Sequence, residues 1–152
     1  MATEQRPTAP RDFLAQYHAD VIAALPEDQV EKFRLRLGAN LLQPFVDSLP
    51  GQTLPPEDLK ARLEVYLRGE LQMAESVEMQ VQGDEVTVEM RGCHLCFGND
   101  RLRAQGKAPL CPFAPGINRA LSKAVQGGTR LEGVEKPTGK TGECLIRYHL
   151  GG

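Results

Sequence analysis

The sequence predicts an α+β domain in which N-terminal helices are followed by an antiparallel four-stranded sheet, made of two hairpins separated by a helix. Two observations support this fold class. Up to about residue 71, apolar residues recur every three or four positions, as on one face of a helix, whereas later stretches alternate apolar and polar residues, as in half-buried strands. The alternating stretches form two pairs, and each pair surrounds a segment of turn-forming residues.

The chain begins with a polar segment and a first predicted helix. Residues 1–10 are polar and contain two prolines, so we expect a disordered N-terminal arm, and residues 11–152 then form a single domain. The helix begins at Asp12, and Pro26 blocks its continuation. Its apolar stripe consists of Phe13, Leu14, Tyr17, Val21, Ile22 and Leu25.

Two more helices are predicted before the sheet. The second opens at Glu27 with acidic residues in its first turn, and Pro44 should end or kink it near Gln43. The third begins at Pro56, because the first turn of a helix tolerates proline, and its apolar stripe continues to Leu71. The first half of the chain is therefore predicted to be helical.

The next segment predicts a β-hairpin. Residues 77–81 and 86–90 alternate apolar and polar side chains across a Gly83-Asp84 turn, so one face of the hairpin should be buried. The segment that follows, residues 91–100, has no clear period and is predicted to be irregular.

The C-terminal part predicts one helix and a second hairpin. The helix should start at about Pro115 and end at Gly127-Gly128. Residues 129–135 and 143–150 are the two strands, and the turn-forming sequence KPTGKTG joins them.

Composition argues against two classes of partner. The net charge is −2 and the 18 Lys and Arg residues are dispersed, so we expect no nucleic-acid and no membrane partner. No apolar run approaches the ~18 residues that span a bilayer. The N-terminus also lacks the pattern of a secretory signal. We therefore expect a cytoplasmic protein, in which thiols stay reduced.

The four cysteines are the main functional candidates. Cys93 and Cys96 form a CxxC pair, a spacing that lets the chain aim two sulfurs at one metal. Cys111 lies just before the predicted helix, where the helix dipole favours a thiolate, and Cys144 lies in the last strand. The sequence thus predicts one metal centre with these four cysteines as ligands. The alternative is that they are buried as small apolar side chains.

The sequence leaves the nature of this centre open. Zinc and a 4Fe-4S cluster both accept four thiolates. The Cys111-Pro112 step and the neighbouring Phe97 and Phe113 are compatible with a cluster, but the compact ferredoxin spacing is absent. His94 could replace a sulfur, although a histidine between two ligands usually points to solvent. A dithiol redox pair is a further alternative, although the CxxC follows a hairpin and no βαβ unit.

Other motifs fail. GVEKPTGKT has five residues between its glycines where a phosphate-binding loop has four, and Cys96 is followed by Phe97 where haem attachment needs histidine. His18 on a helix and His149 on the outward face of the last strand have no neighbouring nucleophile pattern, so both are predicted to be surface histidines. Enzyme activity is therefore not predicted.

Residues 111–150 resemble a known family. A cysteine opens a helix that has glycine in its first turn, a strand with Glu132 or Glu135 follows, and the last strand carries a cysteine. This pattern is similar to the end of the 4-vinyl reductase, or hydrocarbon-binding, domain. The resemblance implies an α+β fold, a small hydrophobic ligand between helices and sheet, often a sensory role, and in some members a zinc site of cysteines and a glutamate.

Transferred by position, Cys111 and Cys144 match this family's zinc site best, and Glu135 is a candidate carboxylate. The cysteine usual after that glutamate is missing, since Pro137 and Thr138 stand there, and the CxxC pair is additional. These departures favour a four-sulfur centre.

Two functions follow from these patterns. The first is a hydrophobic-ligand-binding or sensory domain with a four-cysteine metal centre, acting through a protein partner or as a homodimer. The second is an iron-sulfur protein for redox sensing or electron transfer. Candidate residues of a ligand pocket are Phe33, Tyr66, Phe113 and Tyr148, and the alternative for each is that it simply fills the core.

Overall fold

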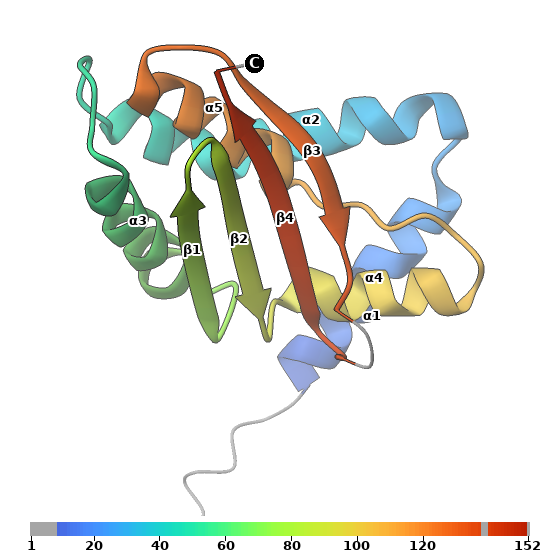
Figure 1. The fold of residues 1–152 in the computed structure, drawn as a ribbon. Coiled ribbons are helices and arrows are strands. Elements are labelled where there is room, and N and C mark those ends of the chain that lie inside the picture. The colour runs from blue at the N-terminus through green and yellow to red at the C-terminus, as the bar shows by residue number, and fades with distance from the viewer. Residues whose placement is uncertain (1–8, 138–139, 152) are drawn as a thin grey trace, which may run out of the picture.

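A four-stranded antiparallel sheet carries helices behind one face and at one end (Figure 1). The computed structural model describes residues 9–137 and 140–151. The helices are α1 (Ala9–Ala24), α2 (Glu27–Ser48), α3 (Pro56–Glu64), which continues into a π-helical segment (Val65–Glu70), α4 (His94–Ala104) and α5 (Phe113–Val125). The strands are β1 (Ser76–Gln82), β2 (Glu85–Arg91), β3 (Thr129–Glu135) and β4 (Glu143–Leu150). The predicted α+β fold class is confirmed.

The sheet joins the two predicted hairpins through its central strands. Its order is β1-β2-β4-β3, and β2 pairs with β4 so that Met90 lies opposite Cys144. The register of β3 on β4 shifts between Leu131 and Gly133, which leaves Glu132 in a bulge. Side chains that face the helices from the central strands are Val86, Val88, Met90, Cys144, Ile146 and Tyr148, and all six are buried.

The N-terminal helix begins earlier than predicted. α1 starts at Ala9, so the last two residues of the predicted arm are helical. The other arm residues, 1–8, lie outside the described residues, as do Thr138 and Gly139 of the predicted KPTGKTG turn. None of the described helices is both long and apolar enough to cross a membrane.

The predicted end of the second helix at Pro44 is wrong, because α2 continues to Ser48. Pro44 is exposed and lacks only its own N–H group, so it removes one helical hydrogen bond. The turn that follows it buries Phe45 and Val46 in the core. Tertiary burial therefore outweighs the local cost of the proline.

The prediction that residues 91–100 are irregular is also wrong, because most of this segment forms α4. Cys93 is the residue before the helix, and Gly98 lies inside it. A Cβ atom on Gly98 would lie 2.7 Å from the His18 ring and 2.9 Å from the Ala15 carbonyl oxygen. The glycine weakens the helical pattern in the sequence but lets α1 and α4 pack closely.

The buried apolar residues form two separate clusters. The main core lies between the sheet and the helices α2, α3 and α5, and it includes Cys93, Cys96 and Cys144. A smaller cluster joins α1, α4 and the segment before α5, with Ala19, Ile22, Leu102 and Leu110 at its centre. Cys93 and Cys96 therefore lie at the start of the helix that connects the two clusters.

Candidate metal centre

The four cysteines come from three separate parts of the chain. Cys93 and Cys96 lie at the start of α4, Cys111 lies two residues before α5, and Cys144 lies in β4. All four are free thiols. Cys93, Cys96 and Cys144 are buried in the main core, and the half-buried Cys111 packs against it. The fold thus gathers the predicted ligands on one side of the sheet.

Cys96 occupies the middle of this group. Its thiol is in hydrogen-bonding contact with the thiols of Cys93 and Cys144. Cys111 lies close enough to Cys144 and Cys93 for their charges to act on it. Among the described residues, however, no three of the thiol sulfurs all lie within 4.8 Å of one another. The four sulfurs therefore form an open group.

The environments of the thiols differ. A hydrogen bond with the Cys96 thiol lowers the pKa of Cys93 against the effect of burial, and the N–H groups of Cys96 and Leu95 lower it further. Hydrogen bonds with Cys144 and Cys93, together with burial, raise the pKa of Cys96. Cys93 should therefore lose its proton before Cys96 does.

Backbone N–H groups at two helix starts point at sulfurs. Burial raises the pKa of Cys111, whereas hydrogen bonds from the N–H groups of Ala114 and Phe113 lower it. Cys93 accepts similar bonds at the start of α4. Burial outweighs these bonds at Cys111, whose pKa is raised overall, whereas the hydrogen bonds prevail at Cys93 and favour its thiolate.

His94 lies between the two CxxC cysteines but is not directed at the thiols. Its ring has Gln72, Arg11 and Glu75 as neighbours. Burial, followed by the charge of Arg11, lowers the pKa of His94. Within the described part of the chain, its Nδ1 atom is buried without a hydrogen-bond partner. The alternative in which His94 replaces a sulfur has no contact among the described residues to support it.

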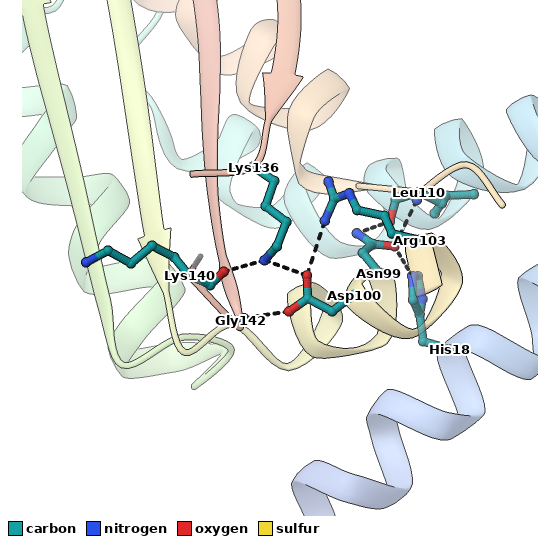
Figure 2. A network of polar contacts seen from close by, with 8 residues as sticks. All are labelled: His18, Asn99, Asp100, Arg103, Leu110, Lys136, Lys140 and Gly142. Atoms are coloured by element: carbon teal, nitrogen blue, oxygen red, sulfur yellow. Dashed lines mark hydrogen bonds and ion pairs between the residues drawn. The ribbon is translucent and has the colours of Figure 1, made fainter. Parts of the chain in front are cut away.

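His18 is not the surface histidine that the sequence predicts. Only 5% of it is exposed, and its Nε2 atom lies 2.9 Å from Oδ1 of Asn99 (Figure 2). Asn99 donates from Nδ2 to the carbonyl oxygen of Leu110 over 3.0 Å and accepts from the N–H of Leu110 over 2.9 Å. These two bonds fix the amide orientation, so Nε2 of His18 must carry the hydrogen that Oδ1 accepts.

Acid should destabilise the protein through His18. Burial lowers the pKa of His18 below its ordinary value of 6.5, so its neutral form contributes stability above pH 6.5. This stability is lost as the pH falls through the folded-state pKa, because the unfolded chain then binds the proton more readily. We expect the urea midpoint of wild type to fall more between pH 7.5 and 5.5 than that of His18→Gln, which keeps an N–H donor. Parallel curves would contradict this assignment.

One compact group of charged side chains was not predicted. Glu85, Glu132 and His149 come from three strands on the outer face of the sheet, and their ligand atoms all lie within 4.8 Å of one another. His149 faces outward as predicted and lies 3.1 Å from Glu85, and Arg130 lies 3.4 Å from Glu132. The pairing of Glu85 with His149 and of Glu132 with Arg130 accounts for the close approach of these side chains. No periodicity in the sequence reveals it, because it depends on strand register and on the β3 bulge.

Three of the predicted pocket residues, Tyr66, Phe113 and Tyr148, lie in the main core, and Phe33 lies apart from them. Phe113 and Tyr148 are fully buried, and the Tyr148 hydroxyl donates to the Ala114 carbonyl oxygen over 2.8 Å. Tyr66 is buried, donates to the Leu41 carbonyl oxygen over 2.6 Å and packs on Phe45. Phe33 belongs to the smaller cluster. An apolar hollow between helices and sheet measures about 10 Å³ and is lined by none of the four. Tyr66 lines an open surface hollow of about 320 Å³ between α2 and the α3 segment, together with Phe45, Ser48, Ala61, Arg62, Val65 and Glu70.

Comparison with known proteins does not assign this site. No protein-family model matches the chain, and no curated protein matches it. The similarity of residues 111–150 to the 4-vinyl reductase domain therefore stays a prediction. The case for a functional site rests on the geometry of the four thiols.

Proposed function

We propose that the protein binds one metal centre through Cys93, Cys96, Cys111 and Cys144. The observation that carries this proposal is the contact of Cys96 with both Cys93 and Cys144, three buried free thiols from two distant segments, with Cys111 beside them. Uncharged thiols gain little from such an arrangement, whereas thiolates need a cation to be buried together. A centre of this kind would tie α4 to the sheet and to the start of α5.

The donor set fits zinc and fits an iron-sulfur cluster. A tetrahedral zinc ion at 2.3 Å from each sulfur holds sulfurs about 3.8 Å apart. Because no three of the four described sulfurs lie within 4.8 Å of one another, both Cys111 and the group of Cys93, Cys96 and Cys144 would have to draw closer around the ion. A cluster is larger, and backbone N–H groups and apolar surroundings of the kind seen at Cys93 and Cys111 stabilise it. A closed four-sulfur zinc site would stabilise the fold or serve a sensory role. A cluster would carry out one-electron transfer.

The interior gives less support to a hydrophobic ligand. Phe113, Tyr148 and Tyr66 are buried, and the two tyrosine hydroxyls bond to backbone carbonyl oxygens, as core residues do. A drug-sized ligand needs a cavity of roughly 300 Å³ or more. Ligand binding between the helices and the sheet stays a prediction that would require the core to open.

Metal analysis tests the proposed centre. Protein purified without oxygen should contain one centre per chain, measured by elemental analysis, acid-labile sulfide and ultraviolet-visible absorption. Zinc at about one per chain without colour identifies a zinc site, since a single ion satisfies four thiolates. Iron with matching sulfide and a brown colour identifies a cluster. Absence of both, with free thiols throughout, contradicts the proposal.

A further inference from the structure

Two consecutive residues of α4, Asn99 and Asp100, reach toward different cysteine-bearing segments (Figure 2). Asn99 is buried and pairs with both the N–H and the carbonyl group of Leu110, as a neighbouring strand would. Leu110 directly precedes Cys111. The amide of Asn99 therefore sets the position from which Cys111 approaches the other thiols.

Asp100 fixes the segment that leads into Cys144. Its Oδ2 atom accepts the N–H of Gly142 over 2.7 Å, and its Oδ1 atom lies 2.7 Å from Nζ of Lys136. Gly142 then accepts N–H bonds through its carbonyl oxygen from Gly92 over 2.9 Å and from Cys93 over 3.3 Å. The residues around the CxxC pair and those before Cys144 are thus locked together.

The position of Gly142 has no room for a side chain. Its φ of +73° is a conformation that favours glycine, and a Cβ atom there would collide with the Phe97 ring on α4. The β3–β4 turn therefore docks closely on the helix that carries Cys96.

We propose that Asn99 and Asp100 are positioning residues of the metal centre, Asn99 for Cys111 and Asp100 for Cys144. The inference rests on the proposed function. Because both side chains belong to the helix that Cys93 and Cys96 begin, a single rigid element presents two ligands and places the other two. Substitution of a residue that holds a metal ligand in place, without touching the metal itself, typically lowers metal affinity by about 10–100-fold.

Cobalt replacement tests the assignment of each residue to one cysteine. Co²⁺ occupies thiolate sites, and its sulfur-to-metal absorption per bound ion rises with the number of thiolates. We expect Asn99→Leu to show about three quarters of the wild-type absorption, as Cys111→Ser does, because one of four thiolates is lost. Asp100→Ala should match the spectrum of Cys144→Ser. The two positioning variants, Asn99→Leu and Asp100→Ala, should each bind Co²⁺ about 10–100-fold more weakly than wild type.

Two further variants separate positioning from general support of the fold. Asp100→Asn keeps an oxygen for the Gly142 N–H and should restore the four-thiolate spectrum. Thr129→Val removes a hydroxyl that bonds to the carbonyl oxygen and Oδ1 of Asn118 and to the Ser122 hydroxyl where β3 meets α5. It should cost about 1–2 kcal/mol of stability while leaving the spectrum unchanged.

The outcomes distinguish the two proposals. If Asn99→Leu and Asp100→Ala lose stability as Thr129→Val does but keep the four-thiolate spectrum, the positioning roles are wrong and the centre stands. If wild type shows no thiolate absorption with Co²⁺, the centre itself is wrong. Asp100 lies at the edge of the core, with its side chain 17% exposed, so its pair of variants gives an answer even if Asn99→Leu fails to fold.

Discussion

Replacement of Cys96 by serine is expected to remove most of the bound metal and to lower the melting temperature. Cys96 contacts both Cys93 and Cys144, so its loss disconnects the sulfur group at its centre. Loss of a direct ligand should weaken binding by more than the 10–100-fold typical of outer partners. A metal present at about 100 times its Kd contributes about 2.7 kcal/mol of stability, and most of this would be lost. Elemental analysis and thermal unfolding measure both effects.

Met90→Leu is the matched control for this substitution. Met90 is a buried sulfur-containing residue opposite Cys144 in the β2–β4 register, and leucine keeps its volume. The control should retain full metal content and a melting temperature close to that of wild type. Equal metal content in Cys96→Ser and wild type would refute the shared centre.

Gly38→Val should destabilise the fold strongly by forcing α2 and α5 apart. A Cβ atom on Gly38 would collide with the backbone carbonyl oxygen of Pro112, which cannot move aside as a side chain could. The helices also meet at Gly116, whose Cβ would lie 2.6 Å from Leu42. Overpacking typically costs 1–3 kcal/mol, and the backbone contact places this case near about 3 kcal/mol. Urea denaturation would measure the loss.

The same substitution at Gly69 provides the comparison. Gly69 lies in the π-helical segment after α3, and a Cβ atom there would meet nothing within 4 Å. Gly69→Val should change stability by less than about 0.5 kcal/mol, as surface substitutions do. If both substitutions lowered stability by similar amounts, the loss at Gly38 could not be attributed to the close approach of α2 and α5.

Local periodicity explains how much of the fold could be predicted. Both hairpins and the three N-terminal helices follow from the spacing of apolar residues, because each of these elements buries one face. α4 was missed because Gly98 interrupts its pattern and its helix is stabilised by contact with α1. The expected helix end at Pro44 is wrong for a related reason, because burial of Phe45 keeps α2 helical beyond the proline.

The candidate site could be predicted only in part. Cysteine chemistry and the CxxC spacing identify the four thiols as candidates, and the two-hairpin topology brings Cys144 beside the end of β2. Asn99 and Asp100 could not be recognised, because their bonds span 11 and 42 residues along the chain. His18 was misplaced for the same reason, since its partner Asn99 is 81 residues away.

The irregular register of β3 protects an open edge of the sheet. Both edge strands pair with one neighbour among the described strands, β1 with β2 and β3 with β4 (Figure 1). The bulge at Glu132 breaks the even row of N–H and carbonyl groups that a strand from another molecule would need. Exposed Arg130, Glu132 and Glu135 along the same strand add a desolvation cost to any such pairing. Both features disfavour pairing of β3 with a strand of another molecule.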